Sequence, residues 1–396
     1  MTFFVIIFVI LIIHFSFFLQ LYITGSTQIS FFGWVSEFNY PIEIANKSLL
    51  YIVICTIALC IGYFTKRKSN RSCLLQSNYI YEGARLHKIR TLFKITVVFQ
   101  ILVALTVIIK GHGVYNRMAE IRESMNFLFE LRIFPLILFT YIVQFIDRQN
   151  YKKFESEIFL FTVLFFLFLI IQARSLIFEC GCILAYYYLK RHKNKVKFKY
   201  IVILYLISIL PNIIVLGRLS SEQSNLMNIE TWKNIFTYEY TILFNSIVGE
   251  VIANTKEYLY GGSIFSSFGL LLPSFIRDFL GIAMDKSYIG QIARNAGVYG
   301  GGFSLFAEMY LNFGWFSPAI FLMIGYFLAR QDNMWFNKPQ ISIYSCSVPI
   351  IYSYIILGMR NDMGVLVKQI IQLYIVIYLI RLLVRTKFCK NEIITG

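Results

Sequence analysis

Charge is scarce in this sequence. Only 15% of its 396 residues are charged, whereas soluble domains carry about 25%. The seven cysteines form no CxxC pair and no cluster with the four histidines, so neither a zinc site nor a disulfide framework is indicated. The first apolar run has no basic stretch before it and no small-residue cleavage pattern, so we expect an uncleaved first helix. The low charge argues against a soluble globular domain.

Hydrophobic residues dominate instead, at 58% of the chain, and they fall in long runs. About 20 apolar residues in a helix cross the ~30 Å hydrocarbon layer of a membrane. The sequence therefore predicts an all-α polytopic membrane protein. We expect ten spans, at residues 2–23, 48–64, 92–110, 131–146, 158–172, 175–189, 200–216, 303–329, 343–359 and 364–384.

The basic residues predict the orientation, because cytoplasmic loops of membrane proteins carry an excess of Lys and Arg. Such residues gather after the second, fourth and sixth spans and in the C-terminal tail, while the opposite loops are poorer in them. This alternation predicts that both termini are cytoplasmic, in a bacterial inner membrane. It also accounts for the net charge of +16 without any binding of nucleic acid.

One long segment, residues 217–302, is predicted to be periplasmic. It contains two apolar stretches, 235–252 and 263–282, which are either short interfacial or re-entrant helices or one additional helical hairpin. The total is therefore 10–12 spans, because only an even number of extra crossings preserves the orientation. We find no domain boundary and predict a single membrane domain over residues 1–396.

Charged residues at the membrane edge are costly and therefore suggest function. Arginine suits planar, bidentate binding of phosphate oxygens, so several arginines on the outer side suggest an anionic head group. Each arginine can instead anchor the end of a span or pair with a carboxylate, as Arg174 is expected to pair with Glu179. The outer-side candidates are Arg174, Arg218, Arg277, Arg294 and Arg360, together with the carboxylates Asp278, Glu308 and Asp362.

A glycine run, residues 300–302, leads into an apolar helix that carries one polar stripe. Ser304, Glu308 and Asn312 are spaced four residues apart, so they share one face of that helix. A polar stripe on an apolar span faces a cavity or other protein. Glu308 is thus a candidate general base near an anion site, or else an ion-pair partner that holds an arginine. The alternative bases are Asp362 and His112.

Aromatic residues near the outer face, Tyr310 among them, either stack on sugars or belong to the interfacial belt. No group of side chains has metal-ligand spacing. The first outer loop offers only Glu37 and Glu43, which are six residues apart. We therefore expect no metal and no cofactor.

The segment from Gly301 through Gly314, followed by a glycine-containing apolar span that ends at Arg330, resembles the O-antigen polysaccharide polymerase (Wzy) family. The upstream Tyr260-Gly261-Gly262-Ser263 and Leu272-Pro273-Ser274-Phe275-Ile276 also resemble that family. So do the Arg174-Ser175 pair and the Arg360-Asn361-Asp362 turn. The match covers residues 258–364 in motifs and the rest of the chain in architecture only.

The resemblance implies a periplasm-facing glycosyltransferase with a membrane fold like that of the GT-C enzymes. It would transfer a growing polysaccharide from undecaprenyl diphosphate to the end sugar of a lipid-linked repeat unit. In that scheme Glu308 is the base, and the diphosphate is bound by Arg218, Arg277, Arg294 and Arg360. The supporting residues are Arg174, Ser304, Tyr310, Asn312 and Asp362. The reaction would need no metal, and a chain-length regulator of the polysaccharide co-polymerase type would be a partner.

Two other functions are compatible with this architecture. An O-antigen ligase uses the same lipid-linked donor but a different acceptor, lipid A–core. A lipid-linked oligosaccharide flippase is a transporter, which usually has internal symmetry and short loops. The sequence has no visible repeat and one loop of 86 residues (302 − 217 + 1), and the segment around Glu308 favours the polymerase.

Overall fold

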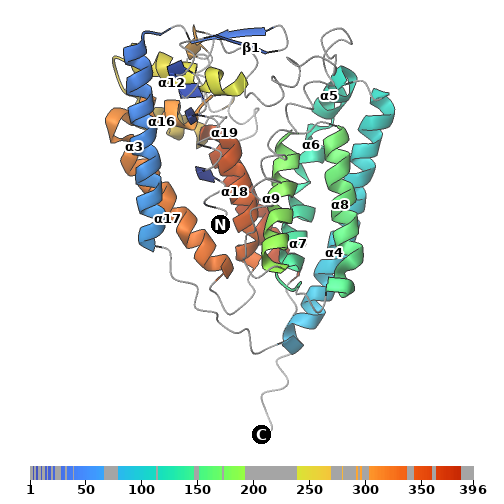
Figure 1. Ribbon diagram of the computed structural model, residues 1–396. Coiled ribbons are helices and arrows are strands. Elements are labelled where there is room, and N and C mark those ends of the chain that lie inside the picture. Colours follow the sequence, from blue (N-terminus) through green and yellow to red (C-terminus); the bar gives the residue numbers. More distant parts are fainter. Residues whose placement is uncertain are drawn as a thin grey trace. The chain divides into compact units, whose positions relative to one another are not determined.

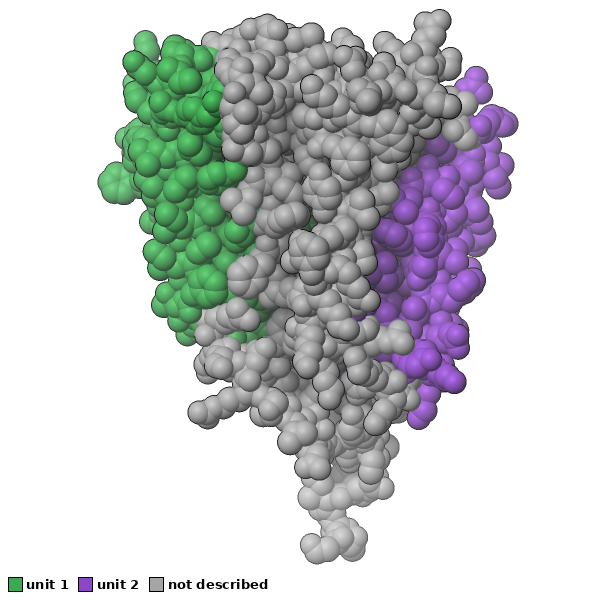
Figure 2. Space-filling model, viewed as in Figure 1, with its two compact units in different colours: residues 1–70, 196–336, 351–370 green, residues 71–195, 337–350, 371–396 purple. Residues whose placement is uncertain are grey.

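The computed structural model describes about two thirds of the chain and divides it into two compact units, coloured green and purple in Figure 2. Unit 1 comprises residues 1–70, 196–336 and 351–370, and unit 2 comprises residues 71–195, 337–350 and 371–396. The described residues are 3, 6–7, 10, 14–15, 17–18, 21–22, 28–31, 34–38, 40–66, 79–112, 115–146, 151–171, 174–191, 239–268, 279, 291–292, 295–296, 303–336, 343–358 and 363–384.

Helices form most of the described structure (Figure 1). Unit 1 contains α3 (Ile42–Lys66), α12 (Glu239–Asn254), α13 (Gly262–Phe268), α16 (Leu305–Phe313), η4 (Gly314–Phe316) and α17 (Ser317–Phe336). Unit 2 contains α4 (Tyr79–Gly111), α5 (Tyr115–Ser124), α6 (Asn126–Glu130), α7 (Ile133–Val143), η2 (Tyr151–Phe154), α8 (Glu155–Ile170), α9 (Arg174–Arg191) and η5 (Ile343–Cys346). Residues of both units make up α18 (Ser347–Gly358) and α19 (Met363–Leu383).

Four helical stretches among the described residues are long and apolar enough to cross a membrane. They are Ile42–Lys66, Leu86–Gly111, Leu305–Trp335 and Met363–Leu383. The helices at four other predicted spans, namely α7, α8, α9 and α18, are shorter than these stretches. Most of the predicted span 2–23 and all of residues 200–216 lie outside the described part of the chain. The protein is therefore a multi-pass helical membrane protein, and the total of 10–12 spans stays a prediction.

Two details differ from the predicted all-helical chain. A short antiparallel hairpin, β1 (Gln28–Phe31) and β2 (Trp34–Glu37), precedes α3, with Phe31 paired to Trp34. Only two residues separate the strands in sequence, and the second is Gly33, a spacing typical of tight hairpins. The predicted span 303–329 is not one helix, because Gly314 ends α16 with a positive φ of 54°.

Two glycines let α3 and α17 pack closely in unit 1. A Cβ atom on Gly62 would lie 2.0 Å from the carbonyl oxygen of Leu322, and one on Gly325 would lie 2.1 Å from that of Leu59. Small residues of this kind allow membrane helices to approach backbone to backbone. The two helices are also joined near their C-terminal ends, where Asn333 Nδ2 donates to the Lys66 carbonyl at 2.9 Å.

Side-chain contacts give the relative directions of the helices in unit 1. In its first half α3 contacts η4, which precedes α17, where the rings of Tyr51 and Trp315 lie 5.8 Å apart. The last residue of α3, Lys66, accepts a hydrogen bond from Asn333, near the end of α17. The helices α3 and α17 therefore run in the same direction. The N-terminal segment runs the opposite way along α3, because Phe3 stacks on Tyr63 at 3.8 Å and Tyr22 donates to Asn46.

Aromatic side chains form the core of unit 2. Phe139 of α7 stacks on Phe161 of α8 at 4.0 Å and lies 5.6 Å from Phe93 of α4. Arg90, in the first half of α4, joins that helix to the first turn of α8, because its Nε donates to the buried Glu157 carboxylate at 2.8 Å.

Candidate functional site

The polar stripe predicted on residues 304–312 is present on α16. Ser304 precedes the first turn, Glu308 and Asn312 follow one and two turns later, and all three side chains are fully buried. The Glu308 backbone N–H donates to the Ser304 carbonyl at 2.9 Å, and Asn312 Nδ2 donates to the Glu308 carbonyl at 2.7 Å. A fully buried carboxylate requires hydrogen-bond donors, so its partners identify the elements around it.

The first partner of Glu308 is Ser263, in the first turn of α13. Its hydroxyl donates to Glu308 Oε1 at 2.6 Å, and its oxygen accepts from Asn312 Nδ2 at 2.7 Å. The Ser263 backbone N–H donates to Asn312 Oδ1 at 3.3 Å. The three side chains therefore form one chain of hydrogen bonds, in which Asn312 fixes the hydroxyl that holds the carboxylate. Sequence reasoning did not assign Ser263 to the site.

The second partner of Glu308 is the backbone of α19. The Met363 N–H, at the first residue of that helix, donates to Glu308 Oε2 at 2.5 Å. A carboxylate at a helix N-terminus is stabilised by the free amides and by the helix dipole. Glu308 thus links α13, α16 and the first residue of α19, all within unit 1.

The loop before α13 is held against the end of α16. The N–H groups of Leu259 and Tyr260 donate to the carbonyls of Leu311 and Asn312 at 3.0 and 2.9 Å. Tyr260 has a φ of 48°, which is uncommon for a residue with a side chain, and the next residue, Gly261, has a φ of 90°. The backbone therefore turns sharply at this point and brings Ser263 beneath the polar stripe.

Tyr310 is part of an aromatic cluster beside the same helix. Its ring lies edge-on to Tyr51, Trp315 and Tyr258 at centroid distances of 5.0, 6.0 and 6.1 Å. The Tyr51 hydroxyl donates to the Phe306 carbonyl at 3.0 Å. Tyr310 is buried, so in this structure it packs α16 against α3.

A comparison with known families decides what kind of protein carries this site. The model of the family described as O-antigen polysaccharide polymerase Wzy matches residues 1–392, nearly the whole chain. The chain belongs to the O-antigen polysaccharide polymerase Wzy family. No protein of curated function and no solved structure gives a significant match. Membership of the Wzy family makes the protein an enzyme of lipopolysaccharide biosynthesis, which polymerises lipid-linked O-antigen repeat units.

All four arginines proposed for the Wzy diphosphate site lie outside the described part of the chain. Arg174 begins α9, but its side chain is not described. His112, an alternative base, is exposed after the end of α4, with a φ of 49°. The site residues outside the described ranges are Arg218, Arg277, Arg294, Arg360 and Asp362.

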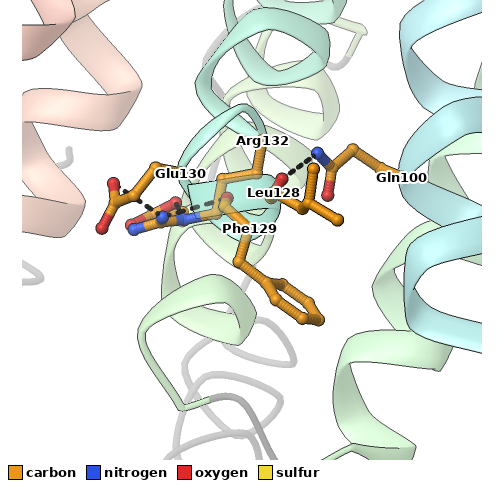
Figure 3. Close-up of polar contacts among 6 residues, drawn as sticks. Gln100, Leu128, Phe129, Glu130 and Arg132 are labelled. Atoms are coloured by element: carbon orange, nitrogen blue, oxygen red, sulfur yellow. Dashed lines mark hydrogen bonds and ion pairs between the residues drawn. The ribbon is translucent and has the colours of Figure 1, made fainter. Parts of the chain in front are cut away.

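Sequence reasoning expected Glu179 to pair with Arg174, and the structure gives it a different partner. Arg132, just before α7, donates to the two carboxylate oxygens of Glu179 through Nε and Nη2 at 3.2 and 3.3 Å. Arg132 also donates to Glu130 at 3.1 Å and to the Phe129 carbonyl at 3.2 Å, and Gln100 Nε2 donates to the Leu128 carbonyl nearby (Figure 3). Because the Arg174 side chain lies outside the described part of the chain, its predicted pair with Glu179 stays a prediction, and Arg132 is the partner that the structure describes.

Arg132 and Glu179 are both buried in unit 2, so each charge is compensated by the other and not by water. The bidentate geometry is the one that arginine favours with carboxylates. Removal of either partner alone would leave an uncompensated buried charge. Arg132 therefore stabilises the start of α7 in the polymerase.

A further cluster ties α12 to the residues before α3. The Tyr40 hydroxyl donates to Glu250 Oε2 at 2.5 Å, and Asn295 Nδ2 donates to Glu250 Oε1 at 3.1 Å. Burial, and then the Glu250 carboxylate, raise the pKa of Tyr40, so the phenol stays protonated as a donor. The long segment 217–302 of the Wzy chain thus contains a helix fixed to the rest of unit 1.

Proposed function

We propose that this Wzy polymerase transfers the growing polysaccharide from undecaprenyl diphosphate to the end sugar of an incoming lipid-linked repeat unit, at the periplasmic face and without a metal ion. The family match carries the polymerase function. The buried network of Ser263, Glu308 and Asn312 supports the position of the reaction site. Burying polar groups in an apolar helical bundle costs free energy, so such networks are found most often at functional sites.

In the proposed reaction, Glu308 takes the proton of the attacking sugar hydroxyl. The hydroxyl oxygen forms a bond to the anomeric carbon of the donor. The bond from that carbon to the diphosphate oxygen breaks, and undecaprenyl diphosphate leaves with the electron pair. A positioned base of this kind contributes typically 10²- to 10⁴-fold to a rate. The hydrogen bonds from Ser263 and Met363 support this role because they fix the carboxylate in one orientation.

Arginines are proposed to neutralise the diphosphate, as developing charge on a leaving group requires. Arg360 precedes Met363 by three residues in the sequence. The hydrogen bond from Met363 to Glu308 therefore connects the proposed base to the segment that carries Arg360. Arg218, Arg277 and Arg294 belong to the same proposal on their sequence positions alone.

The wider setting is also a proposal. It comprises a GT-C-like bundle of 10–12 spans in the bacterial inner membrane, with both termini cytoplasmic and residues 217–302 periplasmic. The membrane lipid and a chain-length regulator of the polysaccharide co-polymerase type are its partners. The relative directions of the helices in unit 1 support the alternation of spans on which this topology rests.

The test has a genetic arm and a biochemical arm. A strain without the gene should make lipopolysaccharide with core plus one repeat unit, whereas bare core would indicate a ligase or a flippase. Purified protein should extend synthetic lipid-linked repeat units in the presence of EDTA. Loss of activity on chelation, with recovery on addition of Mg²⁺ or Mn²⁺, would disprove the metal-independent reaction.

The role of Glu308 is tested with Glu308→Gln and a matched control, Glu250→Gln. Both carboxylates belong to unit 1 and accept hydrogen bonds from two protein groups. A base at Glu308 predicts a rate loss of 10² or more at normal protein level for Glu308→Gln only. Polymers of normal length from Glu308→Gln would eliminate it as the base.

A further inference from the structure

The N-terminal end of α16 has a serine in the capping position that does not cap the helix. Ser304 has the extended backbone of a cap residue, with φ −122° and ψ 129°, but its side chain makes no capping hydrogen bond. Its hydroxyl is fully buried and has no hydrogen-bond partner among the residues that the structure describes. In an ordinary cap this oxygen would accept a hydrogen bond from the second or third amide of the helix.

Because Ser304 does not cap the helix, two kinds of hydrogen-bond donor lie at the N-terminal end of α16: backbone amides and a hydroxyl group. The amides of the first turn, Leu305 to Ala307, have no partner within a helix. Ser304 adds an O–H at the same end. A buried polar group without a partner destabilises a protein, so the Ser304 hydroxyl, beside amides that have no acceptor within the helix, favours an external acceptor.

The charge of Glu308 does not fill this role in the structure. Its carboxylate oxygens accept from Ser263 and from the Met363 N–H, so its charge is stabilised by the N-terminus of α19. Glu308 is the one acidic residue in the first turn of α16, so its engagement with Ser263 and Met363 leaves the positive end of that helix dipole without another carboxylate from the same turn. Helix N-termini with a hydroxyl donor are well suited to the oxygens of phosphate groups.

We propose that the Ser304 hydroxyl and the first-turn amides of α16 bind an oxygen of the donor lipid's diphosphate. This inference rests on the proposed function and assigns a part of its substrate to particular atoms. The groups at this end are donors, which matches an anionic oxygen better than a sugar hydroxyl, since a hydroxyl must also donate. Negative charge increases on the diphosphate as it leaves, so fixed donors there stabilise the transition state.

The test measures binding to the full-length protein in phosphatidylcholine nanodiscs. The probes are undecaprenyl diphosphate and undecaprenol, which lacks the diphosphate. Ser304→Ala should weaken the binding of undecaprenyl diphosphate about tenfold, as expected for the loss of one hydrogen bond to a charged group. Binding of undecaprenol should not change. The matched control is Ser48→Ala, which removes an equally buried hydroxyl that donates within α3.

Two more variants separate a cap from a binding site. Asp and Asn are both strong N-caps, so Ser304→Asp and Ser304→Asn should satisfy the helix amides themselves. A binding site predicts that both weaken diphosphate binding, and that Asp, with its charge, weakens it further, by about a hundredfold or more. A simple cap predicts that Asn binds the diphosphate lipid as the native protein does.

The outcomes separate this inference from the proposed function. If the native protein extends repeat units while Ser304→Ala and Ser304→Asn bind undecaprenyl diphosphate normally, the inference is wrong and the polymerase function stands. If binding of undecaprenol falls in parallel, the variants have damaged the fold and the inference is again rejected. If the native protein binds the diphosphate lipid but never extends repeat units, the proposed function fails.

Discussion

Replacing Ser263 by Ala should uncouple Glu308 from the chain of hydrogen bonds that holds it. The substitution removes the donor to Glu308 Oε1, at 2.6 Å, and the acceptor for Asn312 Nδ2, at 2.7 Å. The bond to the carboxylate contributes about 1.5–3 kcal/mol, as is usual for a charged partner. The loss at Asn312 is smaller, because its Nδ2 also donates to the Glu308 carbonyl. We therefore expect Ser263→Ala to lower the free energy of unfolding by about 2–3 kcal/mol.

A double-mutant cycle with Glu308→Gln isolates the pair. Unfolding in an SDS titration is measured for the native protein, the two single variants and the double variant. Direct bonding between Ser263 and Glu308 predicts a coupling energy of about 1.5 kcal/mol or more. Distant sites add to within about 0.5 kcal/mol, so additivity of that quality would refute the contact. The matched control pairs Glu308→Gln with Ser48→Ala, whose hydroxyl bonds within its own helix.

Three other predictions follow from the packing and the topology. In an SDS unfolding titration, Gly325→Ala should lower the free energy of unfolding by about 1–3 kcal/mol or more, because the added Cβ would overlap a backbone carbonyl. The control Gly181→Ala should leave it unchanged, because a Cβ there has nothing within 4 Å. In the same assay, Arg132→Met should lower the free energy of unfolding by about 3–5 kcal/mol, because it leaves the buried Glu179 carboxylate without its counter-charge. Unchanged stability would contradict the ion pair. Alkaline phosphatase should be active when fused within 217–302 and inactive after Lys195, and the reverse pattern would overturn the orientation.

The sequence predicts the helices well where apolar runs are long. The run 48–64 corresponds to α3, and 364–384 corresponds to α19, because an unbroken apolar segment in a membrane has few alternatives to a helix. The break in the run 303–329 was missed, although Gly314 marked it. Hydrophobicity alone does not report that the backbone adopts a positive φ at that glycine.

The candidate site, too, was predictable from the sequence only in part. The spacing of Ser304, Glu308 and Asn312 correctly predicts a shared face, because four-residue spacing fixes a side of a helix. Their partners were not predictable in this way. Ser263 lies 45 residues before Glu308, and the Met363 N–H lies 55 residues after it, so only the tertiary fold brings them together. A backbone N–H also has no signature in the sequence.

The packing of unit 1 constrains the number of membrane crossings independently of the basic residues. Since α3 and α17 run in the same direction, an odd number of crossings must separate them if both span the membrane. Five spans are predicted before the long segment, at 92–110, 131–146, 158–172, 175–189 and 200–216. Five is already odd, so these predicted spans together with the shared direction of α3 and α17 predict an even number of crossings in the segment 217–302. Side-chain contacts and the distribution of Lys and Arg, two unrelated observations, thus lead to the same condition, and α12 is either not a crossing or one of a pair.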